Sequence, residues 1–149
     1  MTIHLTAFLA DSAEAVNGKL YVLGAGWDTL AAPSFPTVQP RIAIGVIVHV
    51  GWNDTDTEHE LALRLETEDG QLLPLAGDGS DPGTAVVQLG QRFTAHRFPG
   101  LTPGADQAHP LTFTINNLRV PHSGGYSWAL LVDGNVAHRL PMHVATLEP

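Results

Sequence analysis

The sequence predicts an all-β fold: a single two-sheet antiparallel β-sandwich of about eight or nine strands, with a Greek-key, immunoglobulin-like or jelly-roll-like topology. Three observations predict it. Apolar and polar residues alternate with a period of two in several segments, an Asn-Gly or Asp-Gly pair separates such segments three times, and no segment has the spacing of a long amphipathic helix. The 149 residues are expected to form one domain, residues 1–149, because a chain of this length can bury a core of its own.

The first part of the chain is predicted to form a hairpin. Residues 3–9 and 20–27 are its strands, and Asn17-Gly18 lies between them, because both central residues of a type I′ turn need φ > 0. Residues 11–16 are expected to form at most about one helical turn. The segment between Trp27 and Arg41 contains Pro33, Pro36 and Pro40 and is predicted to be a loop, since proline cannot donate a ladder hydrogen bond.

The middle of the chain shows the clearest alternation. Residues 41–50 form a β-branched run, and residues 59–68 (HELALRLETE) set leucines against charged side chains. Asp69-Gly70 is predicted to turn the second strand back onto residues 71–76, and residues 77–83 are predicted to form a loop. The residues expected to face inward are Ile42, Ile44, Val46, Val48 and Val50 in the first run and Leu61, Leu63 and Leu65 in the second.

The last part of the chain supplies the remaining strands. Residues 85–96 and 111–120 are predicted strands, the segment from Pro99 to Pro110 is a predicted loop, and Asp133-Gly134 is the turn of a final hairpin. Pro141 should confine part of the last strand to an edge or a bulge. The faces expected to be apolar hold Tyr126, Trp128, Leu130 and Val132 before the turn, and Val136, His138, Leu140, Met142 and Val144 after it.

Composition excludes several classes of partner and site. Fifteen acidic against seven basic residues give a formal charge of −8, whereas nucleic-acid and anionic-membrane binders need clustered Lys and Arg. No apolar stretch approaches the roughly 20 residues of a membrane helix, so no membrane insertion is expected. The chain has no cysteine, which removes disulfides, thiolate metal sites and cysteine nucleophiles. Residues 1–15 lack a basic n-region, and Asp11 interrupts their apolar run, so no signal peptide is predicted and the expected location is cytoplasmic.

Two segments resemble a family of small bacterial all-β proteins described only as a domain of unknown function. Residues 9–30 (LADSAEAVNGKLYVLGAGWDTL) contain its Gly-Lys pair and LxxLGxxW-like strand, and residues 120–144 (VPHSGGYSWALLVDGNVAHRLPMHV) contain its Gly-Tyr and VDG hairpin. This resemblance implies the fold and carries no activity. A looser similarity links residues 123–128 (SGGYSW) to immunoglobulin-like β-sandwiches, which implies a tyrosine corner at Tyr126.

No residue stands out as catalytic, no cofactor is predicted, and the chain is not expected to be an enzyme. Gly24 and Gly26 follow a predicted strand, but Thr29 replaces the third glycine of a dinucleotide fingerprint, and the prolines that follow prevent the helix which that motif needs. No GxSxG motif occurs. A bulge or a tight strand bend explains these glycines instead.

No metal site is predicted, although the eight histidines leave open whether any meet in space. No HxH pair occurs, and His138 and His143 should point to opposite faces unless Pro141 causes a bulge. His138 should lie on the apolar face, and His4, His49 and His96 on polar faces. Two acidic loops leave calcium binding open: residues 54–60 with Asp54, Asp56 and Glu58, and residues 77–83 with Asp78 and Asp81.

The leading functional hypothesis is a non-catalytic binding or assembly module that acts through protein–protein contacts, with a protein partner or self-association as a homo-oligomer. Sheet edges offer the pairing surfaces for such contacts. The alternative is a β-sandwich that binds a small molecule, carbohydrate or lipid through loops and exposed aromatics such as Trp27 or Trp52. The third hypothesis is a metal-dependent enzyme, which would need three converging His, Asp or Glu side chains.

Overall fold

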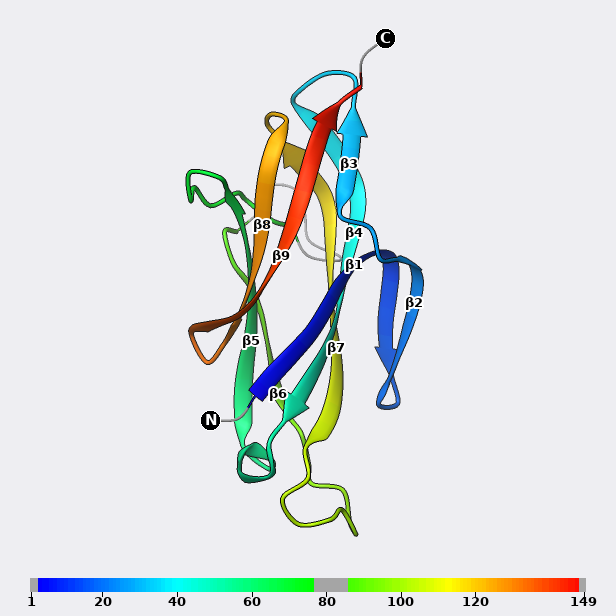
Figure 1. Ribbon diagram of the computed structural model, residues 1–149, viewed down its shortest axis with the longest axis vertical. Coiled ribbons are helices and arrows are strands. Elements are labelled where there is room, and N and C mark those ends of the chain that lie inside the picture. The colour runs from blue at the N-terminus through cyan, green and yellow to red at the C-terminus, as the bar shows by residue number, and fades with distance from the viewer. Residues whose placement is uncertain (1–2, 77–85, 148–149) are drawn as a thin grey trace.

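The computed structural model describes residues 3–76 and 86–147, and within them the chain is all-β, as predicted (Figure 1). The one helical element there is a 3-10 turn, η1 (Trp52–Asp54), and none of the described helical residues forms a span that could cross a membrane. The nine strands are β1 (Ile3–Val16), β2 (Lys19–Ala25), β3 (Thr29–Ala32), β4 (Thr37–Val50), β5 (Glu58–Thr67), β6 (Leu89–Thr94), β7 (Gln107–Val120), β8 (Gly124–Val132) and β9 (Asn135–Thr146).

The strands form two sheets. The first has the order β2-β1-β4-β7 and is antiparallel throughout, and the second has the order β3-β9-β8-β5-β6. In the second sheet β3 runs parallel to β9, from Thr29 beside His143 to Ala32 beside Thr146, so the prediction of purely antiparallel sheets is wrong here. The prediction of a loop between Trp27 and Arg41 is wrong for β3 and also for the start of β4, which begins at Thr37 and tolerates Pro40 at a position that the β4–β7 register leaves out. The four residues of β3 precede Pro33, so no proline interrupts their pairing.

The predicted inward-facing residues do form the core. All five of the alternating residues in β4 and all three leucines of β5 are fully buried, and Tyr126, Trp128, Leu130 and Val132 of β8 are at most 4% exposed. These side chains belong to a single buried cluster that draws on both sheets. The period-two alternation therefore identified the apolar face of each of these strands.

β1 corrects two predictions about the start of the chain. It is one strand of 14 residues: Ile3–Ala10 pairs with β4, and Ala10–Val16 pairs with β2. Residues 3–9 therefore pair with β4 rather than with residues 20–27, apart from a hydrogen bond from the Gly26 N–H to the Leu9 carbonyl, and residues 11–16 are a strand rather than a helical turn. The Asn17-Gly18 turn, with φ of 51° and 72°, gives the reason: a two-residue turn pairs Val16 directly with Lys19, which keeps the preceding residues extended.

The hairpin of β1 and β2, which we call the arm (residues 11–25), forms the β2 end of the first sheet and stands to one side of β4 and β7 in Figure 1. Gly45 lies between the buried Ile44 and Val46 and therefore faces outward from the core. A Cβ atom at Gly45 would lie 2.5 Å from the Phe8 ring and 3.3 Å from the Leu20 side chain. Glycine at this position thus lets the arm pack closely on β4.

The middle of the chain departs from prediction after β5. Residues 71–76 form no strand, and only isolated bridges follow the Asp69-Gly70 turn. Pro74 interrupts the return, and β6 pairs with the rest of this edge of β5. β6 is also shorter than the predicted strand at 85–96, and β7 begins at Gln107 inside the predicted loop. The predicted loop at 77–83 lies outside the described residues.

The last hairpin is confirmed, with one correction. Asp133 and Gly134 have φ of 50° and 86°, as a type I′ turn requires. A register shift between Leu130 and Leu131 sets Val136 opposite Leu131, so Val136 leaves the predicted apolar face and is 48% exposed. Pro141 lies on a part of β9 that β3 does not reach, so its predicted edge position is correct.

Candidate functional site

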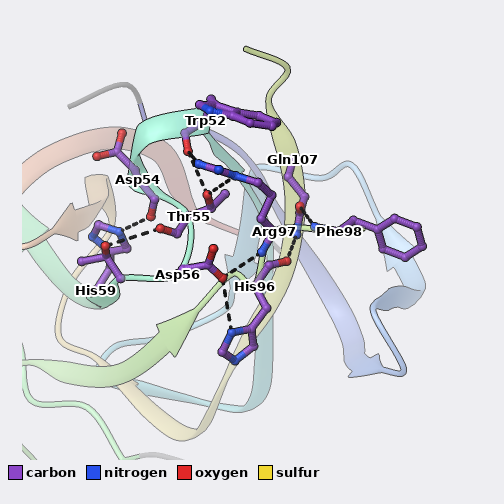
Figure 2. A network of polar contacts seen from close by, with 10 residues as sticks. Trp52, Asp54, Thr55, Asp56, His59, His96, Arg97, Phe98 and Gln107 are labelled. Carbon is purple, nitrogen blue, oxygen red and sulfur yellow. Dashed lines mark hydrogen bonds and ion pairs between the residues drawn. The ribbon is translucent and has the colours of Figure 1, made fainter. Parts of the chain in front are cut away.

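A polar network joins four segments at one end of the molecule (Figure 2). They are the loop of η1 that connects β4 to β5, the start of β5 with His59, the residues that follow β6, and the first residue of β7. The two aspartates of the acidic loop at 54–60, Asp54 and Asp56, both lie in this network. Its contacts decide what chemistry these residues can perform.

His59 is the most buried ionisable residue of the network, with 6% of its surface exposed. Its Nδ1 lies 2.8 Å from Asp133 Oδ2, and its Nε2 lies 2.8 Å from the Asp54 carbonyl oxygen. Both partners are acceptors, and a neutral imidazole carries one N–H, so only the imidazolium can make both hydrogen bonds. Burial lowers the pKa of His59, but these hydrogen bonds and the carboxylates of Asp133 and Asp54 outweigh it and raise the pKa above its usual value.

Asp133 serves both the turn and the network. Its Oδ1 accepts a hydrogen bond of 2.9 Å from the Glu60 N–H, while Oδ2 accepts from His59. Burial raises the pKa of Asp133, but the hydrogen bonds from His59 and Glu60 and the charge of His59 lower it overall. This carboxylate therefore anchors the β8–β9 turn to the start of β5. With both ring nitrogens engaged and the ring buried, His59 has no free lone pair for base catalysis or for a metal.

Four contacts fix the position of Arg97. Its guanidinium lies 3.7 Å above the centre of the Trp52 ring, and its Nε donates to Thr55 Oγ1 at 3.0 Å. Its Nη2 donates to the Trp52 carbonyl, and its backbone N–H donates to Asp56 Oδ1. Gln107 fixes the next residues, because its amide accepts from the Phe98 N–H and donates to the His96 carbonyl. The Phe98 side chain points away from the network and is 69% exposed (Figure 2).

These contacts bear on whether the acidic loop at 54–60 binds calcium, which the sequence left open. The Asp56 carboxylate accepts from Arg97 and lies 3.6 Å from His96 Nδ1. Within residues 3–76 and 86–147, no three His, Asp or Glu side chains converge as a metal site would require. Asp78 and Asp81, of the second acidic loop, lie outside this part of the chain.

The other histidines fall largely where the sequence placed them. His4 lies directly opposite His49 on the outer face of the first sheet, and His49 Nε2 lies 2.9 Å from Thr6 Oγ1. His138 lies opposite Leu130 and His143 opposite Gly125, so they occupy opposite faces of β9. His109, which the sequence did not single out, stacks on Phe93, and burial lowers its pKa, with a further contribution from His96.

Tyr126, Trp27 and the two glycines before β3 bear on three further predictions. The Tyr126 hydroxyl donates a hydrogen bond of 2.6 Å to the carbonyl of His122, four residues earlier, which confirms the predicted tyrosine corner. Trp27 is not the exposed aromatic that the ligand-binding hypothesis expected, because it is partly buried against the core. Gly24 and Gly26 have positive φ and lead into β3, so no helix follows them as a dinucleotide site would require.

Sequence reasoning missed His59, although a signal for it existed. His59 continues the alternate positions of Leu61, Leu63 and Leu65, so the stripe itself predicts an inward-facing histidine. Its partner Asp133 is 74 residues away, and only the register of β5 against β8 brings the two together. Arg97 and Trp52 likewise meet across 45 residues of sequence.

The outermost strand of the first sheet presents a different kind of surface. β2 pairs only with β1 among the described strands, and its Tyr21 and Leu23 side chains are 57% and 72% exposed. They point to the same side of the arm, because they are two residues apart in an extended strand. The arm thus presents an unpaired edge and two exposed apolar side chains together.

A comparison with protein families bears on the resemblance noted in the sequence. The model of a family described as "Family of unknown function (DUF6941)" matches residues 5–145. This match confirms the resemblance to a domain of unknown function. No curated protein matches the chain.

Proposed function

Because the chain belongs to the DUF6941 family, a family of unknown function, we propose from the geometry alone that it is a non-catalytic assembly module that acts through protein–protein contacts. The edge of β2 makes the contact. The observation that carries this proposal is the exposure of Tyr21 and Leu23 on an end strand. Exposed hydrophobic edge strands pair readily with another strand, and natural proteins usually block them.

The backbone of β2 is arranged for such pairing. The two-residue turn makes Val16 and Lys19 a hydrogen-bonded pair, so the N–H and C=O groups of Lys19, Tyr21 and Leu23 point toward β1. Those of Leu20 and Val22 therefore point away from the sheet, toward a further strand. The strand has no proline, and Lys19, at its first position, is its only charged residue, so few of the usual blocking devices are present.

A second copy of the chain fits this edge. An antiparallel pair with its twofold axis at Val22 sets Tyr21 of one copy opposite Leu23 of the other, twice. Such aromatic–aliphatic pairs across strands stabilise a sheet. Charge favours the same contact: the chain carries −8, but β2 contains no acidic residue, so two copies approach at a segment without carboxylates.

Native mass tests the proposal. The wild-type chain, measured by light scattering across a concentration series, should reach twice its 15.9 kDa. The double variant Tyr21→Lys, Leu23→Lys should stay monomeric, because paired ammonium groups would face each other across the edge. Val136→Lys is the matched control: it places the same charge on another exposed apolar residue, in β9, and should still dimerise. A wild-type mass of 15.9 kDa at every concentration would overturn the proposal, as would a dimer that survives the double substitution.

The proposal has two further parts. We infer that the two sheets pack face to face as a sandwich, which is supported by the single buried cluster they share and by the tyrosine corner at Tyr126. We also place the module in the cytoplasm, which the lack of cysteine supports, since a reducing compartment does not favour disulfides.

A further inference from the structure

A cavity of about 750 Å³ lies at the end of the molecule away from the polar network. It is bounded by the start of β4, the end of β7 with the two residues that follow it, and the residues that close β5 and its turn. Val38, Leu72, Pro74 and Pro121 give it apolar walls. Its size suits a small organic ligand.

Asn117 explains why polar residues of β7 face this cavity. Phe113 and Ile115 are buried at odd positions of the strand, whereas Leu118 and Val120 are buried at even positions. The change occurs at Asn117, whose φ of 51° interrupts the extended backbone and reverses the alternation. Asn117 and Arg119 therefore lie outside the core and line the cavity.

Among the described residues that line the cavity, Arg119 carries a positive charge and none is acidic, in a chain whose net charge is −8. Arg119 forms no hydrogen bond or ion pair with its side chain in the described part of the protein, unlike Arg97 or Arg139. Val38 lies directly opposite Arg119 in the β4–β7 register, so an apolar surface adjoins the guanidinium.

We propose that this cavity binds a small organic carboxylate with an apolar body, and that Arg119 receives the carboxylate. A guanidinium presents paired N–H donors that match a carboxylate, and a charge-assisted pair of this kind is stronger than a neutral hydrogen bond. The apolar walls take up the rest of the ligand, which a hydrated inorganic anion would leave unfilled. This inference does not depend on assembly through β2.

Octanoate and 1-octanol are the probes that test it. They have the same chain and differ in the charge of the head group, so their binding separates recognition of the carboxylate from general apolar binding. Amide chemical shifts of the full chain, followed through a titration by NMR, report both the affinity and the location. Octanoate should shift residues 71–76 and 117–122, and it should bind about tenfold more tightly than octanol, as expected for a charged hydrogen-bonding pair.

Four variants test whether Arg119 receives the carboxylate. Arg119→Gln should weaken octanoate binding about tenfold and leave octanol unchanged, because it removes the charge from an exposed residue. Arg41→Gln is the matched control, since Arg41 is an exposed arginine of β4 that does not line the cavity, and it should bind octanoate like the wild type. Val38→Glu should abolish octanoate binding, because the new carboxylate would face Arg119, whereas Val38→Gln should largely retain it.

The proposal would be overturned if octanoate and octanol bound equally, if Arg119→Gln changed nothing, or if the shifts appeared elsewhere. The charged β2 variant separates the two proposals, because Tyr21→Lys, Leu23→Lys should lose assembly and still bind octanoate. Loss of both properties in that variant would mean that the cavity depends on the assembled state, which contradicts the independence stated here.

Discussion

The two Asp-Gly turns of this protein look alike in sequence and differ in the structure. Gly70 and Gly134 both have left-handed backbones, with φ of 80° and 86°, but of the two aspartates only Asp133 does. The Asp133 turn joins two full strands, β8 and β9. After the Asp69 turn, the returning chain meets β5 in the isolated bridge between Glu66 and Leu72 and forms no strand with it.

The residues around each turn account for the difference. The carboxylate of Asp133 accepts hydrogen bonds from His59 and from the Glu60 N–H, so the turn is fixed to a neighbouring strand. After the other turn, Pro74 removes a backbone donor, and β6 takes the remaining edge of β5. An Asp-Gly pair therefore predicts that the chain reverses, whereas the flanking residues decide whether a second strand forms.

The largest effect should come from the strand next to both turns. Leu63→Ala in β5 should lower the free energy of unfolding by about 2–5 kcal/mol, because Leu63 is fully buried. Urea unfolding followed by tryptophan fluorescence measures the change. Val136→Ala, on a residue that is 48% exposed, should change it by about 0.5 kcal/mol or less. Equal effects of the two variants would contradict the core assignment.

The next effect tests the carboxylate that distinguishes the turns. Asp133→Asn keeps a residue that tolerates positive φ, but it removes the charge that faces the His59 imidazolium. The expected loss is about 1–3 kcal/mol, toward the lower end because the Asp133 side chain is 35% exposed and water screens the pair. Asp69→Asn is the matched control and should change stability by about 0.5 kcal/mol or less. Similar urea midpoints for the two variants would show that the His59 contact does not stabilise the fold.

The glycines should give a smaller and more even effect. Gly134→Val and Gly70→Val each force a β-branched side chain into a left-handed backbone, so each should cost more than about 1 kcal/mol. They should differ in a local signal: Gly134→Val should loosen the packing of Trp128 in β8 and alter the native fluorescence, while Gly70→Val should not. An unchanged urea midpoint for Gly134→Val would contradict the strain expected at this turn.

The same comparison shows which features of the fold could be predicted from the sequence. Alternation identified the inward faces of β4, β5 and β8, because burial on one face requires a period of two. It failed at Val136, where a register shift reverses the alternation. In β7, for which no inward face was predicted, the left-handed residue Asn117 reverses it as well. Those reversals depend on the paired strand, which a single segment does not contain.

The candidate sites were beyond sequence reasoning for a related reason. The contact between His59 and Asp133 depends on the register of β5 against β8. The cavity at Arg119 depends on three chain segments, around Val38, residues 67–76 and residues 117–122, which the folded sheets bring together. That the Arg119 side chain has no partner among residues 3–76 and 86–147 is likewise visible only once the folded structure gives the partners of the other arginines.

The smallest effect is a pH dependence confined to the Asp133 turn. His59 has a raised pKa when folded, so its contribution is complete below its unfolded pKa of about 6.5 and is lost as the pH rises through the folded pKa. Asp133 has a lowered pKa, so its contribution is present above an unfolded pKa of about 3.9 and is lost as the pH falls through the folded pKa. The pair therefore stabilises the fold most between about pH 4 and 6.5.

The difference in stability between the wild type and Asp133→Asn isolates this pair. His109 has a lowered pKa, so its contribution is complete above its unfolded pKa and falls as the pH decreases, opposite to that of His59. His109 is present in both chains, so subtraction removes its effect. Urea midpoints measured from pH 3 to pH 9 should give a difference that is largest near the middle of that window and shrinks on both sides. A difference that stays constant across this range would mean that His59 does not carry the charge that its two hydrogen bonds require.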